Sequence, residues 1–529
     1  MNKKNLIVIL LFFSVLLTVI YTASDYGIAW DEPQYFHSSD LIMKWFTMFW
    51  DSLRNGNIND VISDETITKY WHWDPYHVPH PPFSRILSGI TKTIFSPLAG
   101  SIAYRFSTAF FFAILTVMVF FWMAELYDIK TGIFSALSVF LMPHLFGHAH
   151  FAMTDIPLTT MWFLTVYCFY RGLTNYRWSI VLGIVFGLSL STKFPALLAP
   201  IPLFIWAHIY RRKEYHNNAF SMIFLSPIIM VATQPYLWHR TLPRIIEFVY
   251  DSTTRLYTVG IGKSFPTYFF HMVYFSDTIP WFYTYFITAV SIPIAILIFS
   301  LICIFFYLKR KLKDEFSALS VINCAFILTV PLMPGGVIHD GVRLLLPAFP
   351  FIAVLAGVGF YYGCRFFLAR LASYNIFSHI NNLDKKMAAV IFIVVYSLPA
   401  IDIVTIHPYE LSYYNILVGG IKGANKLGLE TTYLQEVITP SFLESLNREL
   451  PKNTRLNAAF SNFMMEIYQK NGFLRRDIKI TYNLDCDVYM LLNRQGAFND
   501  FEKWLVANNQ PAMALRVKDA PLIFLYRFR

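Results

Sequence analysis

Ionisable side chains stand at the ends of several long apolar segments of this sequence. An adjacent acidic pair, Asp31-Glu32, follows the first segment, and Asp155 precedes the fourth. Lys193 follows the fifth segment and Arg343 precedes the tenth. A carboxylate can act as general base toward a hydroxyl or hold a cation, whereas Lys and Arg can bind a phosphate. Together these types suit a lipid-phosphate donor and a hydroxyl or amine acceptor, with the cations stabilising the departing phosphate.

Other polar residues collect at the same ends of the apolar segments and could line a substrate cavity. They are His80 in the run His80-Pro81-Pro82-Phe83, His148 and His150, Tyr236, the pair His339-Asp340, and Tyr413. The spacing of the histidines to Asp155 matches no strong zinc signature. No cofactor is required by the pattern, and a divalent cation stays open.

Each of these residues also has a structural interpretation. The pair Asp31-Glu32 could be a helix N-terminal charge favoured by the macrodipole. Lys193 could extend its ammonium group to the membrane surface, and Arg343 could be an interfacial anchor. The His80-Pro81-Pro82 run could be a rigid turn. Taken singly, none of the residues decides between structure and chemistry.

The composition predicts a polytopic α-helical membrane protein. The chain has 529 residues, of which 56% are hydrophobic and 14% charged, against about 25% charged in soluble proteins. The formal charge of +10 is spread over short loops, as the positive-inside bias requires, so nucleic acid is not an expected partner. Four of the five cysteines lie in or beside apolar runs, which argues against a disulfide framework.

The apolar runs predict about eleven transmembrane helices. The expected spans are roughly 5–24, 102–124, 132–147, 156–171, 178–192, 194–210, 219–234, 282–308, 316–333, 344–363 and 387–405. Lys3 and Lys4 place the N-terminus in the cytoplasm, and the basic runs 211–213 and 309–313 then fall inside. The first run could be a signal peptide, but it lacks a clear small-residue cleavage site, which favours an uncleaved span.

This topology puts all the polar motifs on the outer face of the cytoplasmic (inner) membrane. Residues 1–429 form the expected transmembrane catalytic domain, with external loops at about 25–100 and 235–280. The first loop contains stretches expected to lie at the interface, at 34–50 and 70–82. Residues 430–529 change in composition and predict a small extracytoplasmic α/β domain. Its expected helices are 441–450 and 463–471, and its expected strands are 477–482, 488–492 and 522–526.

In their order along the chain, these motifs resemble one family of enzymes. They are similar to the GT-C membrane glycosyltransferases, in the branch of the protein O-mannosyltransferases and the lipid A aminoarabinose transferase. The resemblance rests on Asp31-Glu32, His80-Pro81-Pro82-Phe83, Thr154-Asp155-Ile156-Pro157, Lys193, and Arg343 with Leu346-Pro347-Ala348. It covers roughly residues 1–420. The segment 407–415, with Gly419-Gly420 and Gly423-Ala424 after it, resembles a bacterial subgroup.

The resemblance implies a GT-C fold and an inverting glycosyl transfer from a polyprenyl-phosphate sugar to an extracytoplasmic acceptor, which could be protein, lipid or glycan. Asp31 would then be the base or acceptor-positioning carboxylate, supported by Glu32, and Asp155 a second acid in the cavity. Lys193 and Arg343 would hold the lipid phosphate. His80 stands where the mannosyl branch carries a histidine, which favours a neutral hexose.

Two other classes of function remain as alternatives. A transporter or flippase of lipid-linked substrates would place ionisable residues near the middle of its spans and tend to show internal repeats. Here the centres of the spans are nearly free of charge, which favours an enzyme. A ligase that transfers a whole lipid-linked glycan would use the same interfacial location, and only the family resemblance separates it from a glycosyltransferase.

Overall fold

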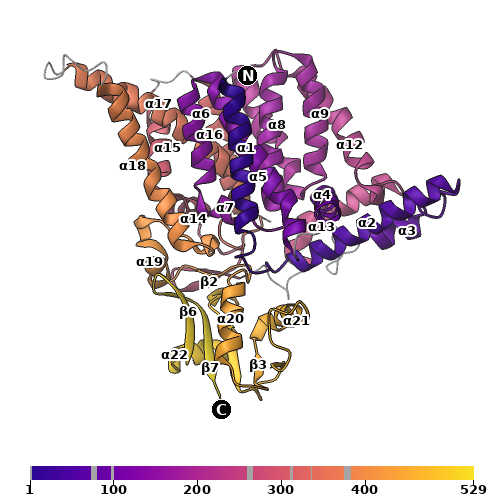
Figure 1. Cartoon of the computed structure of the whole chain (residues 1–529). Helices are drawn as coiled ribbons and strands as arrows, with labels where there is room; N and C mark the ends of the chain where they lie inside the picture. Colours follow the sequence, from indigo (N-terminus) through magenta and orange to yellow (C-terminus); the bar gives the residue numbers. More distant parts are fainter. Residues whose placement is uncertain are drawn as a thin grey trace.

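The chain folds into a helical bundle with a small sheet below it (Figure 1). The computed structural model describes residues 3–72, 80–96, 100–258, 266–309, 314–334, 336–373 and 383–528. Part of the expected interfacial stretch 70–82 and most of the basic run 309–313 therefore lie outside the described residues. The N-terminus lies at the top of the bundle in the view of Figure 1, and the C-terminus lies below the sheet.

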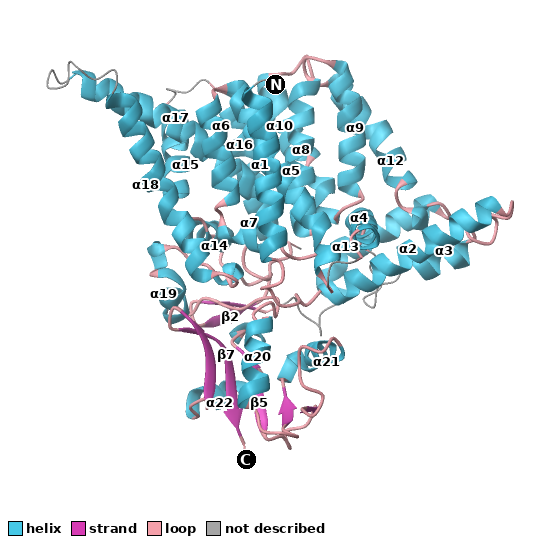
Figure 2. Ribbon diagram, viewed as in Figure 1, coloured by secondary structure: helices cyan, strands magenta, loops and turns pink. Residues whose placement is uncertain are grey.

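Long helices stand side by side in the bundle, roughly along one direction (Figures 1 and 2). They and the short helices between them are α1 (Lys3–Thr22), α5 (Ile102–Leu126), α6 (Ile129–Phe140), α7 (Pro143–His148), α8 (Asp155–Gly172), α9 (Tyr176–Leu190), α10 (Pro200–Tyr210), α11 (His216–Phe220), α12 (Ser226–Ala232), α14 (Tyr283–Ser291), α15 (Ile294–Leu308), α16 (Glu315–Thr329), α17 (Phe349–Ser373) and α18 (Leu383–Ile406). This helical content agrees with the predicted class of fold.

Four described helices are long and apolar enough to cross a membrane: Lys3–Thr22, Ile102–Leu126, Glu315–Leu332 and Arg343–Gly363. Several expected spans are shorter helices, because proline interrupts them. Pro143 separates α6 from α7, and Pro293 precedes α15 after the end of α14. Proline lacks the N–H group that continues a helix. The four apolar helices support an integral membrane protein, while the number of eleven spans and their orientation stay predictions.

Helix α17, with the short turn that leads into it from Arg343, is the most buried of the long helices described. Within its apolar span, 89% of the residues are buried. Neighbouring helices approach its backbone closely at two glycines: a Cβ on Gly357 would stand 1.8 Å from Ser135 Oγ of α6, and one on Gly359 would stand 1.8 Å from the Phe299 carbonyl oxygen of α15. Small residues permit such packing between membrane helices.

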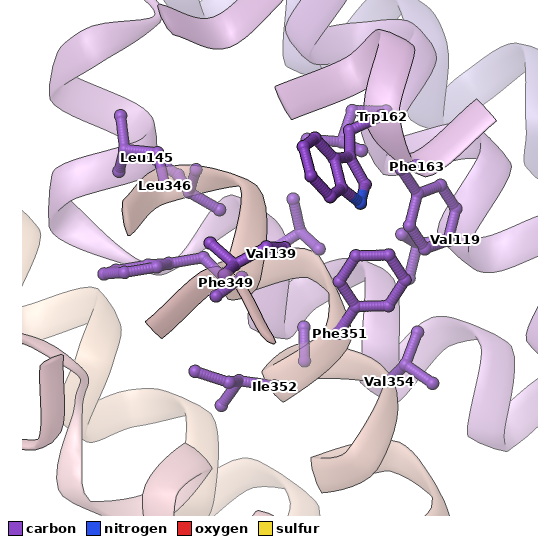
Figure 3. Close-up of a cluster of buried hydrophobic side chains, with 14 of the residues drawn as sticks. Val119, Val139, Leu145, Trp162, Phe163, Leu346, Phe349, Phe351, Ile352 and Val354 are labelled. Atoms are coloured by element: carbon purple, nitrogen blue, oxygen red, sulfur yellow. The ribbon is translucent and has the colours of Figure 1, made fainter. Parts of the chain in front are cut away.

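Large apolar side chains also pack against this helix. Figure 3 shows Phe351 of α17 facing Trp162 and Phe163 of α8. The rings of Phe163 and Phe351 have centroids 5.6 Å apart. This packing fixes α8 against α17, and it therefore fixes the relative position of Asp155 and Arg343, which stand at the starts of these two segments.

A second set of helices lies across the lower end of the bundle in the view of Figure 1. It consists of α2 (Glu32–Arg54), α3 (Asp64–Trp71), α4 (Phe83–Ile94) and α13 (Thr241–Thr258). The amphipathic stretch expected at 34–50 is part of α2. Trp45 of α2 packs against Trp71 of α3, with ring centroids 5.1 Å apart. These helices lie at the end of the bundle where α1 ends and α2 begins.

Residues after 440 form a mixed five-stranded sheet with helices, here named the sheet unit (residues 440–528). Its strand order is β4-β3-β5-β7-β6. The elements are α20 (Pro440–Glu449), β3 (Arg455–Asn457), α21 (Asn462–Lys470), β4 (Lys479–Ile480), β5 (Val488–Leu492), α22 (Asp500–Asn508), β6 (Met513–Val517) and β7 (Ala520–Arg527), preceded by α19 (Gly420–Lys426) and the hairpin β1 (Thr267–Phe269) and β2 (Met272–Tyr274). Strand β3 pairs in parallel with β4 and β5, whereas β7 is antiparallel to β5 and β6.

The helices and strands expected in this region are all present, and three further elements were missed. β3 is only three residues long, β6 lacks clean alternation in burial, and α22 begins after a short loop. The capping box at Asn499 and Glu502, in which each side chain accepts from the other residue's backbone, was the available sign of α22.

A buried ion pair holds the turn between α1 and α2 against the bundle. Arg105 of α5 donates from Nε and Nη2 to the two carboxylate oxygens of Glu32, over 2.9 and 2.7 Å. The same guanidinium donates to the carbonyl oxygens of Ala23 and Gly27. Glu32 also accepts from the backbone N–H group of Ala152, and its side chain is fully buried. The pair therefore joins three segments and sets the position of residue 31.

A second tie joins the end of α1 to the segment after α18. The two ring nitrogens of His407 lie 3.0 Å from Asp25 Oδ2 and 2.7 Å from Glu410 Oε1. Burial alone would lower the pKa of His407, but the hydrogen bonds and charges of Glu410 and Asp25 outweigh it and raise the pKa to about 9. Tyr26 donates to the other oxygen of Glu410 over 2.6 Å.

Replacing Glu32 with Gln should destabilise the protein strongly, because it leaves a buried guanidinium without a charged partner. Breaking a buried ion pair in this way costs about 3–5 kcal/mol. We expect a clear drop in Tm of the purified protein in detergent. The matched control is Glu125→Gln, because Glu125 pairs with Arg171 at a site where both side chains are about one-third exposed, and such pairs contribute about 1 kcal/mol or less. Equal shifts in both variants would contradict this account.

The contacts of His407 with Asp25 and Glu410 should make the stability of the folded protein depend on pH above neutrality. Its pKa in the folded state, about 9, lies above the ordinary value of 6.5, so its stabilisation is complete below about pH 6.5 and is lost as pH rises through 9. We expect Tm to fall more between pH 7 and 10 in the wild type than in His407→Gln. His208→Gln, which alters an exposed histidine of α10, should keep the wild-type slope.

Candidate active site

Asp31 stands at the N-cap of α2, yet its carboxylate does not cap that helix. The residue makes no side-chain capping hydrogen bond. Instead its Oδ2 accepts from Nη2 of Arg343 over 2.5 Å. Its side chain is 27% exposed, more than any other carboxylate around that arginine. A role limited to the helix dipole therefore does not account for Asp31.

Arg343 is the centre of an ion-pair cluster that joins residues far apart in the chain. It opens the 3-10 helix Arg343–Ala348 that leads into α17. Besides Asp31, its guanidinium donates from Nε to Asp155 Oδ2 over 3.1 Å and from Nη1 to Asp340 Oδ2 over 3.2 Å. Only 8% of its side chain is exposed. A single guanidinium fork thus holds three carboxylates, a geometry that an ammonium group could not reproduce.

Lys193 completes the cluster from the end of α9. Its Nζ donates to Asp155 Oδ1 over 2.7 Å, so Asp155 bridges Lys193 and Arg343. Asp155 is the first residue of α8, where the helix macrodipole also favours a negative charge. Lys193 is nearly buried, with 11% of its side chain exposed. This burial contradicts the interpretation in which Lys193 only extends its ammonium group to the membrane surface.

Asp340 links the cluster to the sheet unit. Its Oδ1 accepts from Nη2 of Arg494 over 2.8 Å, and its Oδ2 accepts from Arg343 and from Nδ1 of His339. Burial alone would raise the pKa of Asp340, but the charges of His339, Arg494 and Arg343 outweigh it and hold the pKa well below its usual range. The three carboxylates of the cluster thus face three basic side chains, those of Lys193, Arg343 and Arg494.

The structure brings together five of the residues predicted for the site. Asp31, Asp155, Lys193, Arg343 and Asp340 share the contacts above, and His339 joins them through Asp340. Glu32 does not join the cluster, although it is adjacent to Asp31 in sequence. Its oxygens are engaged by Arg105 and by backbone N–H groups. Its contribution is to position Asp31.

His148 lies next to the cluster and has one unused nitrogen. Its Nδ1 is 2.8 Å from the carbonyl oxygen of His144, whereas its Nε2 is buried and has no hydrogen-bond partner in the described part of the chain. The ring interacts electrostatically with Asp155, Arg343 and Lys193. A substrate hydroxyl or phosphate oxygen at the cluster could therefore use this nitrogen.

Four predicted residues lie elsewhere. Both ring nitrogens of His150 are engaged, by Thr22 and by a backbone carbonyl, and its ring stacks on Tyr26. Tyr413 donates to Asp402 near the end of α18. His80 and Tyr236 line a different pocket, together with Trp71, Gln234, Arg244 and Phe248.

Sequence reasoning missed two arginines that build this region. Arg105 sits inside a long apolar helix, where a buried charge signals a specific partner. That signal was available. Arg494 follows β5 within a stretch without any recognisable motif, and only the folded sheet unit brings it to Asp340.

The cluster offers little to a metal ion. Among the described residues, no group of three or more His, Cys, Asp and Glu side chains is arranged to hold one. The carboxylates of Asp31 and Asp155, which would be its ligands, already face the cations of Arg343 and Lys193. We therefore derive no chemistry from a divalent cation.

Comparison with known families bears on what this cluster does. Residues 79–239 match the family described as dolichyl-phosphate-mannose-protein mannosyltransferase. This stretch of the chain is similar to that family. It contains His80, Asp155 and Lys193, whereas Asp31 and Arg343 lie outside it. The expected resemblance to membrane glycosyltransferases is confirmed, and the match favours the enzyme over the transporter.

Two solved structures show distant similarity to this chain. ArnT from Cupriavidus metallidurans, bound to undecaprenyl phosphate, is 12% identical, with 98% of this chain and 97% of that chain covered and a TM-score of 0.48. The Archaeoglobus fulgidus oligosaccharyltransferase in the apo form is 14% identical over 74% of this chain and 55% of its own, with a TM-score of 0.44. No curated protein matches the sequence.

Proposed function

We propose that the protein transfers a glycosyl group from a polyprenyl-phosphate sugar to an acceptor at the cluster around Arg343. The observation that carries the proposal is the meeting of Asp31, Asp155, Lys193 and Arg343, which come from four distant segments of a chain that contains a mannosyltransferase stretch. Carboxylate and phosphate-binding cations within one site are what such a transfer requires. The site would open to the outer face of the cytoplasmic membrane.

Asp31 is the proposed general base. It is the most exposed carboxylate of the cluster, and its Oδ2 accepts a hydrogen bond from Arg343. In an inverting transfer, Asp31 takes the proton of the acceptor hydroxyl or amine while that atom bonds to the anomeric carbon. The bond from the anomeric carbon to the phosphate oxygen breaks on the opposite side, and the polyprenyl phosphate leaves with the electron pair.

Lys193 and Arg343 are the proposed partners of the departing phosphate. An ammonium group has three hydrogens to donate, and Lys193 uses one of them, toward Asp155, in the described contacts. Two donors of Lys193 are therefore available to a phosphate that approaches the cluster. Asp155 would hold both cations at the required separation, because it bridges them.

Replacing Asp31 with Asn should abolish transfer without loss of the folded protein. An amide of the same shape cannot take a proton from the acceptor, and removing a general base costs about 10²–10⁴-fold in rate. The measurement is sugar release from a radiolabelled polyprenyl-phosphate sugar into envelope acceptors, by purified protein in proteoliposomes. Asp51→Asn, at an exposed position of α2, is the control. Wild-type turnover in Asp31→Asn would refute the base assignment.

Replacing Lys193 with Ala should weaken the binding of the lipid phosphate itself. Charge-assisted hydrogen bonds contribute about 1.5–3 kcal/mol, so we expect the Kd for a sugar-free polyprenyl phosphate to rise about tenfold to a hundredfold. Arg343→Ala should act in the same direction. Lys44→Ala, which removes an exposed cation of α2, should leave the Kd unchanged. An unchanged Kd in both Lys193→Ala and Arg343→Ala would remove the phosphate-binding role.

A further inference from the structure

A short buried segment between the bundle and the sheet unit carries an unusual number of unused polar atoms. This segment, here named the strap, consists of residues 430–436. In the described structure, Oγ1 of Thr431, Oγ1 of Thr432, both amide atoms of Gln435 and Oε1 of Glu436 are buried without a hydrogen-bond partner. Each such group normally costs about 1–3 kcal/mol. Their concentration in one segment calls for an explanation that a single packing defect does not give.

Gln435 is the member of the strap that faces a pocket. The residue is 2% exposed, and its backbone has φ +65°, which is uncommon for a residue other than glycine. Positions of this kind are found where the surrounding structure imposes them, often at binding sites. The pocket is lined by Gln435, Ala459, Phe460, Leu492, Arg494 and Phe498, among others.

The pocket lies where the topology of the sheet favours ligand binding. β3 and β5 are parallel neighbours, so their carboxyl ends lie at the same edge of the sheet. The chain leaves β3 toward β4 on one side of the sheet, and it leaves β5 toward β6 on the other side. Residues 458–461, after β3, line the pocket together with residues around and after the end of β5, namely Leu491, Leu492, Arg494, Ala497 and Phe498. Ligands of open α/β sheets bind at such a switch point.

The pocket is also adjacent to the proposed base. The backbone N–H group of Trp30 donates to the carbonyl oxygen of Leu434 over 2.7 Å, so the neighbours of Asp31 and Gln435 are in direct contact. The ring of Trp30 stacks on Phe460, with centroids 4.2 Å apart and planes 6° apart. Arg494 lines the pocket and pairs with Asp340 of the cluster.

The lining selects a neutral, hydroxylated ligand. Its two charged residues are already paired, Arg494 with Asp340 and Glu502 with Tyr489. An amide such as that of Gln435 offers donors and an acceptor together, which matches hydroxyl groups that both donate and accept. Phe460 is 58% exposed, and its ring offers an apolar face to a ligand. An extended peptide would instead pair with an edge strand, and β3 and β5 are inner strands.

We propose that this pocket binds a saccharide portion of the acceptor, with the amide of Gln435 on its hydroxyl groups and the ring of Phe460 against its apolar face. The inference rests on the proposed function, because the pocket holds the acceptor for attack at the cluster. It names the acceptor as a glycan or glycolipid and gives the sheet unit a role in binding.

Saturation-transfer NMR on the full chain in lipid nanodiscs measures saccharide binding to this pocket directly, without requiring turnover. The probes are neutral tetrasaccharides of glucose, mannose and N-acetylglucosamine, with a threonine-rich peptide as the competing class. We expect at least one tetrasaccharide to bind the wild type, and we expect Gln435→Leu and Phe460→Ala to weaken its affinity at least tenfold. Gln510→Leu, at an exposed position of the sheet unit, should bind as the wild type does, and all variants should keep the wild-type Tm within a few degrees.

The failure of this inference is distinguishable from failure of the proposed function. Asp31→Asn should bind the tetrasaccharide normally, because Asp31 acts in transfer and is not in the pocket lining. If no tetrasaccharide binds, or if Gln435→Leu and Phe460→Ala both bind it with wild-type affinity, the saccharide subsite is wrong even where Asp31→Asn abolishes transfer. Binding of the peptide alone, lost in Gln435→Leu, would overturn the saccharide class.

Discussion

The buried pair of Glu32 and Arg105 is the interaction on which the geometry of this protein depends. A carboxylate and a guanidinium withdrawn from water are stable only when every oxygen and N–H group finds a partner. Here the partners are backbone groups of the turn after α1 and of the segment before α8. Satisfying the charges therefore folds both segments onto α5. Because Glu32 is fixed by Arg105, the adjacent Asp31 is held where it contacts Arg343 together with Asp155.

The cluster around Arg343 illustrates how an apolar bundle can place charges accurately. Asp155 and Arg343 begin two segments whose apolar faces pack through Phe163 and Phe351 (Figure 3). Gly357 and Gly359 bring two more helices close to the same central helix. The charged groups thus stand at the ends of rigid elements, and none of them has to be buried in the middle of a span. Rigid elements position reacting groups better than loops do.

The sequence predicted the members of the cluster better than their neighbours. Asp31, Asp155, Lys193 and Arg343 were identifiable because a charged residue at the end of an apolar run is conspicuous, and their order along the chain resembles one family. The same criterion grouped His150 and Tyr413 with them, since position at a segment end does not reveal side-chain direction. The two rings in fact face Tyr26 and Asp402.

The sheet unit was the least predictable part, for a physical reason. Its strands β3 and β4 are too short to show a period, and its contribution to the cluster comes from one arginine in a loop after β5. The unpartnered polar atoms of the strap cannot be recognised from the sequence, because Thr, Gln and Glu are usually found at protein surfaces. They become informative only when folding buries them.

Arg494 has a thermodynamic consequence of its own. One guanidinium from the sheet unit and one from the bundle, that of Arg343, share the carboxylate of Asp340. A ligand that draws either arginine away changes the electrostatic energy of the other. Linkage then requires the effect to be mutual: whatever factor one occupant of this region applies to the affinity of a second, the second applies to the first. The carboxylate of Asp340 therefore couples the bundle and the sheet unit electrostatically.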